Sequence, residues 1–202
     1  MNTHFLFSRM MWLAILFLSQ PVAGQSIYQQ NNNVLGVGIG FGGVYRDAAT
    51  ATQETPVFNV NFERALWPLG GEKVKGVISL GGLVGYKQST FTGSIGYYNY
   101  SYSMKWRYNI FAVRSAWHLQ SLNGKELKKW DLYWGLMLGA NFYRRTYTDN
   151  DPTFDYGSNA SATITTFGGY LGARYFFNPN FAVTAETGFG YSSLNLGAAY
   201  KF

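Results

Sequence analysis

The sequence predicts an all-β protein, an eight-stranded antiparallel up-and-down β-barrel that spans a membrane after a cleaved signal peptide. Three observations lead to this prediction. Eight segments alternate between apolar and small or polar residues with a period of two, as strands with one lipid-facing side do. The composition combines 19% aromatic residues and 24 glycines with only 13% charged residues. No apolar run reaches the roughly 18 to 20 residues that a membrane-spanning helix needs.

The composition also excludes several classes of protein. Soluble domains carry about a quarter charged residues, well above the 13% in this chain. Because cysteine is absent, the chain has neither a disulfide scaffold nor a thiolate metal site nor a lipid-anchored N-terminal cysteine. The net charge of +6 comes from basic residues scattered along the chain, which argues against nucleic acid as a partner. We expect one barrel domain, because no stretch resembles a linker.

The N-terminus is predicted to be a signal peptide. Arg9 gives it a positive flank, residues 10–18 form an apolar core, and residues 22–24 are small, as a signal peptidase prefers. A membrane anchor would need about twenty apolar residues, but the polar stretch 19–21 ends the run too early. The predicted parts of the chain are therefore the signal peptide, 1–24, and the membrane-spanning β-barrel domain, 25–202.

The strands are expected to begin at Val34, after a short polar lead-in on the periplasmic side over residues 25–33. In each segment the apolar residues are assigned to the lipid side and their small or polar neighbours to the lumen. Turn-forming residues such as Asn123-Gly124 and those at 178–180 separate the segments. The eight predicted strands cover approximately residues 34–45, 55–64, 78–87, 102–119, 130–143, 166–177, 181–189 and 192–202.

The fourth segment changes its alternation partway along. Before Ile110 the even-numbered apolar residues are assigned to lipid, which places Lys105 and Arg107 in the lumen. Beyond Ile110 the apolar residues are odd-numbered. We interpret this change as a β-bulge near Ile110-Phe111 that also turns Arg114 inward. The residues assigned to lipid before the bulge are Tyr102, Met104, Trp106 and Tyr108.

Seven charged residues are predicted to face the lumen and to pair there. Side chains can fill the interior of an eight-stranded barrel, and buried charges need partners. The mixed signs argue against an ion pathway lined by one charge. Arg174 and Glu186 flank the turn at 178–180 almost symmetrically, so we expect the hairpin to set them opposite or diagonal to each other and to pair them. The predicted lumen network consists of Glu63, Lys105, Arg107, Arg114, Asp131, Arg174 and Glu186.

The last eleven residues alternate strictly and end on an aromatic residue, with Leu196, Tyr200 and Phe202 on the apolar face. This ending resembles the C-terminal signal strand of outer-membrane β-barrels. With the eight segments it makes the mature chain similar to the small eight-stranded outer-membrane proteins, the group that contains outer-membrane protein X and the OmpA membrane domain. The resemblance implies a monomer in the outer membrane of a Gram-negative bacterium. Its implied partners are outer-membrane lipids, including lipopolysaccharide, and the outer-membrane assembly machinery.

The resemblance leaves three functions open, because the family includes adhesins, structural proteins, conduits and lipid A enzymes. The first is a non-enzymatic structural or surface-interaction role, with Tyr97, Tyr98 and Tyr100 as contact candidates or as part of an aromatic girdle. The second is a conduit for a small apolar ligand. The third is a lipid-modifying enzyme, which is disfavoured because the histidine of the mature chain, His118, is placed at the periplasmic end.

Two motif-like patterns are interpreted as structural. Residues 38–43 satisfy the glycine spacing of a dinucleotide-binding fingerprint, but the helix that this site needs is not predicted after them. Asp149, Asp151 and Asp155 offer oxygen ligands of the kind that calcium prefers, but the glycine and glutamate of an EF-hand loop are missing. We therefore assign no catalytic, cofactor-binding or metal-binding residue.

Overall fold

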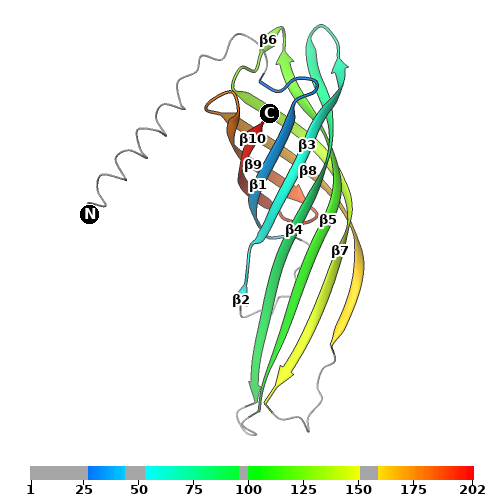
Figure 1. The fold of residues 1–202 in the computed structure, drawn as a ribbon, viewed down its shortest axis with the longest axis vertical. Coiled ribbons are helices and arrows are strands. Elements are labelled where there is room, and N and C mark those ends of the chain that lie inside the picture. The colour runs from blue at the N-terminus through cyan, green and yellow to red at the C-terminus, as the bar shows by residue number, and fades with distance from the viewer. Residues whose placement is uncertain (1–26, 44–52, 96–99, 151–158) are drawn as a thin grey trace, which may run out of the picture.

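The computed structural model describes residues 27–43, 53–95, 100–150 and 159–202 of the chain. The predicted signal peptide lies outside these residues. The described part consists mainly of antiparallel strands (Figure 1). These strands are β1 (Asn33–Phe41), β2 (Gln53–Glu54), β3 (Val57–Gly70), β4 (Val74–Ile95), β5 (Tyr100–Leu122), β6 (Lys125–Glu126), β7 (Trp130–Asp149), β8 (Ala160–Phe176), β9 (Phe181–Phe189) and β10 (Leu194–Lys201).

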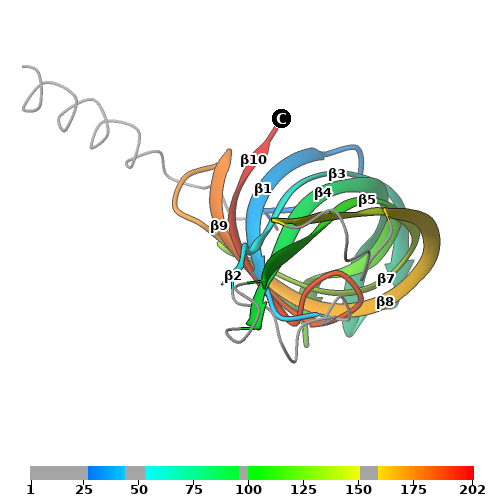
Figure 2. The same ribbon diagram turned by 90° about the horizontal axis from the view of Figure 1, so that it is seen from below.

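The eight long strands close into a barrel, which Figure 2 shows as a ring when it is viewed from one end. Each long strand pairs antiparallel with the next long strand along the chain, in the order β1, β3, β4, β5, β7, β8, β9, β10. The ring closes where β10 pairs with β1, from Val34 opposite Lys201 to Phe41 opposite Leu194. The two-residue strands β2 and β6 add to β4 and β5. These pairings confirm the predicted eight-stranded up-and-down barrel.

The two faces of the barrel wall differ in chemistry. Along β7, Leu132, Trp134 and Leu136 are exposed on the outside, whereas Asp131 and Tyr133 alternate with them and are buried. Exposed large apolar side chains recur on every long strand of the ring, as a wall that faces lipid requires. The described part of the chain contains no helix that is long and apolar enough to cross a membrane.

The inward face of β1 is made of glycine because side chains from its neighbours occupy the space beside it. A Cβ added to Gly38 would lie 2.8 Å from Oδ1 of Asn195 and 3.0 Å from Oδ1 of Asn59. Nδ2 of Asn59 donates a 2.8 Å hydrogen bond to Oδ1 of Asn195 across β1. The glycine face therefore allows two polar side chains from flanking strands to meet inside the barrel.

The turns at the end of the barrel that holds the C-terminus, which we expect to be the periplasmic end, are tight and are built by the residues that the sequence indicated. Asn123 and Gly124 both have positive φ angles, 51° and 75°, as a two-residue hairpin turn requires. In the turn after β8, Oδ1 of Asn178 accepts hydrogen bonds from the backbone N–H groups of Asn180 (2.9 Å) and Phe181 (2.8 Å). The strands run further than the alternating segments predicted, so the connections at this end are shorter than the sequence suggested.

The predicted bulge at Ile110-Phe111 is wrong. The register of β5 against β7 runs without a shift from Tyr102 to Leu119, and its register against β4 is also continuous through this region. Register shifts lie nearer the periplasmic end, for example between Ala65 and Trp67 in β3. The alternation therefore keeps one phase along β5, and the residues that point to the inner side are Tyr102, Met104, Trp106, Tyr108, Ile110, Ala112, Arg114, Ala116 and His118.

The apparent change of phase marks the point where β5 leaves the membrane. Phe111 and Val113 are exposed on the outer surface of the barrel wall, where lipid requires apolar groups. Beyond Asn109 the same surface faces water, and Arg107 is exposed on it. The aromatic residues of this stretch occupy the inner face instead. Lys105 and Arg107 consequently do not face the lumen, which corrects the prediction for these two residues.

One side of the barrel wall extends far beyond the other. Strands β4, β5 and β7 continue past the ends of β1, β9 and β10, on the side opposite the C-terminus (Figure 1). Tyr86, Asn109 and Phe142 lie side by side in these three strands. We call the part beyond them, residues 87–95, 100–108 and 143–149, the outer sheet.

The alternation along β7 predicts how the barrel responds to charge on its lipid side. Leu136 lies midway between Trp130 and Phe142 on the outward face. A Leu136→Arg substitution should reduce the free energy of unfolding by about 2–4 kcal/mol in a bilayer, because the charge would lie near the midplane. Leu122→Arg, next to the turn at the periplasmic end, is the matched control and should cost at most about 1 kcal/mol. Reversible folding into lipid vesicles measures both, and equal costs would contradict this placement.

Candidate functional site

The centre of the lumen holds a set of paired charges, which we call the lumen network: Glu63, Arg114, Asp131, Arg174 and Glu186. All five side chains are buried, with Glu63 fully enclosed. Glu63 lies between the two arginines, 2.9 Å from Nη2 of Arg174 and 3.1 Å from Nε of Arg114. Arg174 also contacts Asp131 at 3.0 Å, and Arg114 contacts Glu186 at 2.6 Å. The network thus links β3, β5, β7, β8 and β9 across the barrel.

The pairing inside the network differs from the sequence-based prediction. The β8–β9 hairpin places Arg174 and Glu186 diagonally, as expected, because Arg174 lies opposite Thr184 and Glu186 opposite Gly172, but no salt bridge joins the two charges. Each of them instead forms its ion pairs with residues from other strands. The barrel is narrow enough for a long side chain to cross it. Ion pairs in the lumen therefore form across the ring as well as between neighbouring strands.

Tyrosines complete the polar contacts of the lumen network. The hydroxyl of Tyr133 donates a 2.8 Å hydrogen bond to Glu186, and that of Tyr191 donates one of 3.3 Å. The guanidinium of Arg114 lies 4.2 Å from the ring centroid of Tyr170, and that of Arg174 lies 4.5 Å from that of Tyr133. These contacts satisfy charges that would be costly to bury alone.

His118 and Ser79 join this cluster, although neither was among the predicted lumen residues. Nδ1 of His118 lies 2.8 Å from Oδ1 of Asp131, and Nε2 lies 3.0 Å from the hydroxyl of Ser79. Nε2 is also 3.4 Å from a carboxylate oxygen of Glu63. The sequence did indicate which face His118 lies on, because residues an even number of positions apart in a strand share a face and Arg114 faces inward.

The order Ser79, His118, Asp131 matches a hydrolytic triad, but its setting is different. Ser79 and His118 are both fully buried, so a substrate has no direct access to the hydroxyl. The imidazole faces carboxylates on both nitrogens. A general base needs a free nitrogen to take the proton of serine, and neither nitrogen of His118 is free of a carboxylate contact. The geometry therefore fits a structural hydrogen-bond bridge.

The residues before β1 close the periplasmic end of the lumen. Ile27 and Tyr28 are buried, and the Tyr28 ring packs 4.3 Å from the imidazole of His118. Nε2 of Gln120 donates to the carbonyl of Tyr28 (2.8 Å), and Nζ of Lys201 donates to that of Ile27 (2.7 Å). Burial and the nearby carboxylates raise the pKa of the Tyr28 phenol, so it remains neutral. Within the described part of the expected polar lead-in, Ile27 and Tyr28 thus act as a plug.

The inner face of the outer sheet carries a column of aromatic rings that begins at the lumen. Tyr108 is buried, with its ring centroid 6.1 Å from that of Tyr143, and Trp106 packs against the same cluster. Nearer the tip, the rings of Tyr102 and Tyr147 stack at 6.2 Å. Of the predicted contact candidates, Tyr100 pairs with Ile95 at the start of β5, whereas Tyr97 and Tyr98 lie outside the described residues.

The predicted assembly signal lies at the seam of the barrel. Leu196, Tyr200 and Phe202 are exposed on the outer surface, and the ring centroid of Tyr200 lies 4.8 Å from that of Phe181. Asn33 and Phe202 exchange two backbone hydrogen bonds of 2.9 and 3.0 Å. The last residue thus closes the ring, and its recognition by the assembly machinery stays a prediction.

A closed ring of eight strands with an apolar exterior and a filled, charged interior defines a small transmembrane β-barrel of the outer-membrane type. The described residues contain no group of three or more acidic or histidine side chains arranged to hold a metal ion; Asp151 and Asp155 lie outside them.

Comparison with known proteins gives matches to solved structures alone. The chain matches no protein-family model and no curated protein sequence. Among solved structures it is similar to the N-terminal β-barrel domain of Pseudomonas aeruginosa OprF, with 11% identity over 86% of this chain and 98% of that chain and a TM-score of 0.48. It is also similar to Ail, the attachment invasion locus protein of Yersinia pestis, with 14% identity over 86% of this chain and 100% of that chain and a TM-score of 0.48.

The lumen network predicts a large effect for loss of one arginine. An Arg174→Met substitution keeps much of the side-chain volume but leaves Glu63 and Asp131 without their shared guanidinium. The free energy of unfolding should fall by about 3–5 kcal/mol, as measured by urea unfolding in detergent micelles. Lys129→Met at the exposed periplasmic end is the control and should change it by about 0.5 kcal/mol or less. A small effect at both positions would contradict a structural network.

The terminal strand predicts that the last residue is needed for assembly in cells. Deletion of Phe202 should strongly reduce the folded protein in the outer membrane, whereas Phe202→Tyr should assemble normally. Fractionation and heat-dependent mobility on gels measure both. The purified deletion variant should still fold in detergent, because it loses two backbone hydrogen bonds out of a long seam. Normal assembly of the deletion variant in cells would show that the signal lies elsewhere.

Proposed function

We propose that this protein is a non-enzymatic barrel in the outer membrane of a Gram-negative bacterium that presents its outer sheet to partners at the cell surface. The observation that carries the proposal is the extension of β4, β5 and β7 beyond the closed part of the ring (Figure 1). Strands need not extend so far to cross a membrane, since about 9–11 residues suffice. The proposed protein is a monomer, which is supported by the closure of the ring within one chain.

The filled lumen supports a role in contact and not in transport. The lumen network crosses the barrel at its centre, and Ile27 and Tyr28 close one end of it. A conduit for an apolar ligand would need an opening through the end or the wall. The seam between β1 and β10 is paired from Val34 to Phe41, and Asn33 bonds to Phe202 beyond it, so β1 is paired along its whole length. The described structure therefore offers no specific support for a conduit.

The inner face of the outer sheet supports a surface-interaction role. Aromatic rings give large rigid contact areas, and tyrosine adds a polar tip. Trp106, Tyr143 and Tyr147 are partly exposed on this face, and they adjoin the buried Tyr108. Anchoring to a rigid core lowers the entropy cost of binding. The contact residues that we propose thus lie along the sheet, in addition to the predicted candidates at its tip.

The closed lumen predicts the behaviour of the protein in planar bilayers. Purified wild-type protein should show no steady, large single-channel conductance, because paired side chains occupy the centre of the barrel. Recordings at both polarities measure this directly. A sustained open level at wild-type sequence would contradict a filled lumen and would favour transport over surface contact.

The aromatic face predicts which substitutions reduce binding at the cell surface. Trp106→Ser combined with Tyr147→Ser should reduce adherence of protein-expressing cells to their target surface on the order of tenfold or more, because central aromatic residues dominate interface energies. Adherence to collagen-, fibronectin- and mucin-coated surfaces and cell–cell aggregation provide the measurements, at matched surface expression. The control is Ser103→Ala with Thr148→Ala on the opposite face. Wild-type protein that promotes none of these contacts, or equal loss in both variants, would contradict the proposal.

A further inference from the structure

The outward face of the outer sheet carries a cluster of like charges. Arg107 in β5 and Arg144 in β7 lie directly opposite each other, and both are exposed. Lys105 lies two residues further out on the same face of β5. Directly opposed residues in antiparallel strands have Cβ atoms about 5 Å apart, where like charges destabilise the sheet. We call these three residues the basic cluster.

The protein itself supplies no counter-charge to the basic cluster within the described residues. None of the three side chains forms a salt bridge with them. Beyond the aromatic belt, the described residues on the outward face include no carboxylate, and the neighbours of the cluster carry hydroxyl or amide groups. These neighbours are Gln88, Thr90, Thr92, Ser94, Ser101, Ser103, Asn109, Thr146, Thr148, Ser161, Thr163 and Thr165.

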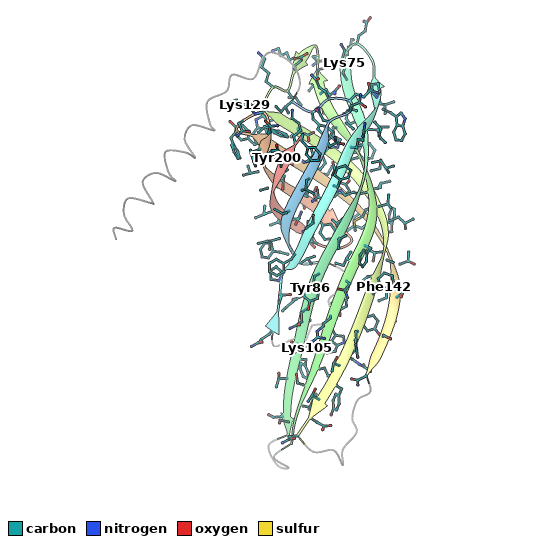
Figure 3. The ribbon with its side chains drawn as sticks, in the orientation of Figure 1. Lys75, Tyr86, Lys105, Lys129, Phe142 and Tyr200 are labelled. Carbon is teal, nitrogen blue, oxygen red and sulfur yellow. The ribbon has the colours of Figure 1, made fainter. Side chains whose placement is uncertain are left out.

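The basic cluster lies just beyond the aromatic belt that marks the outer edge of the membrane. Tyr86 and Phe142 form part of this belt, and Figure 3 shows Lys105 further along the same wall, toward the tip of the outer sheet. Arg144 follows Phe142 by two residues on the same face of β7. Aromatic belts lie at the boundary between acyl chains and headgroups, so the cluster lies at the depth of the headgroups of the outer leaflet.

An apolar groove lies on the membrane side of the cluster. The outward side chains of β1, β3, β4, β5 and β10 line a shallow groove of about 590 Å³ on the lipid-facing wall. Tyr86 and Asn109 lie at its outer end, and Arg107 is the next outward-facing residue of β5. The groove is lined by Val37, Ile39, Phe58, Val60, Val84 and Phe111 among others. A chain lying in it would extend toward Arg107, two residues beyond Asn109 in β5.

We propose that Lys105, Arg107 and Arg144 bind the phosphate groups of a phosphorylated, acylated glycolipid of the outer leaflet, with an acyl chain in the adjoining groove. Guanidinium groups form short, charge-assisted hydrogen bonds with phosphate oxygens. One phosphate between Arg107 and Arg144 removes the repulsion between them, and the hydroxyl and amide side chains around the cluster suit the sugar. The inference rests on the outer-membrane location proposed above and is independent of partner contact by the inner face.

The position of the cluster favours a lipid over a soluble polyanion. A soluble polyanion would contact these side chains from the water side alone and would leave the apolar groove unfilled. The outward face of the wall adjoins lipid, and the groove and the cluster are continuous along β4 and β5. A ligand with a phosphate headgroup and acyl chains uses both features at once.

The test compares two double substitutions in the folded full-length mature protein. Arg107→Gln with Arg144→Gln removes the opposed pair, and Lys75→Gln with Lys129→Gln removes two exposed charges at the other end (Figure 3). Native mass spectrometry from micelles measures binding of bisphosphorylated lipid A. The arginine variant should bind about tenfold or more weakly, because charge-assisted contacts are lost, and the lysine variant within about twofold of wild type. Arg107→Lys with Arg144→Lys should recover part of the affinity.

Three further probes identify the ligand chemistry. Lipid A without phosphates, and the phosphorylated disaccharide without acyl chains, should each bind wild type about tenfold or more weakly than the complete lipid. Any binding of heparin should be independent of Arg107 and Arg144. Equal losses in both double variants, no preference for phosphate, or arginine-dependent binding of heparin alone would overturn the proposal. Adherence through Trp106 and Tyr147 would remain intact in that event, whereas failure of the protein to insert into bilayers would contradict the outer-membrane location itself.

Discussion

The interior of this barrel depends on Glu63, a fully enclosed carboxylate held between two guanidiniums. A charge taken out of water costs several kcal/mol unless partners replace its hydration. Loss of either arginine would therefore leave part of this cost for Glu63 uncompensated. Arg114 and Arg174 extend the pairing to Glu186 and Asp131. Because these residues come from strands on different sides of the ring, the same ion pairs fix the positions of those strands relative to one another.

The environment on the outside of the wall changes along β5, while the strand itself continues unchanged. In the membrane, apolar residues such as Phe111 and Val113 face out, and Arg114 and His118 face in. Beyond Asn109, toward the tip of the outer sheet, the outer face meets water. There the apolar residues, beginning with Tyr108, lie on the inner side. The period of two continues, but the face that carries the apolar residues changes from the outer to the inner one. A sequence pattern that changes phase within one strand can therefore mark a membrane boundary instead of a bulge.

The sequence was sufficient for the strand number, the antiparallel order and the faces of β7, because each depends on local alternation and turn residues such as Asn123-Gly124. The sequence did not predict which charged residues pair with each other in the lumen. Which charges meet depends on positions around the ring, and no local pattern reports them. His118 and Ser79 were missed for the same reason, although the parity of His118 placed it on the inner face. Tyr28 was missed because a short segment outside the strands has no period to read.

The closure of the ring has a consequence for the order in which the molecule can form. Nζ of Lys201 binds the carbonyl of Ile27, 174 positions away along the chain, and Asn33 bonds to Phe202. Contacts between residues so distant in sequence form late, because the entropy of the intervening chain must be given up first. Until β10 is in place, β1 has one unpaired edge and the plug lacks its hydrogen bond from Lys201. The first strand of the ring therefore remains paired on one side only until the last strand joins it.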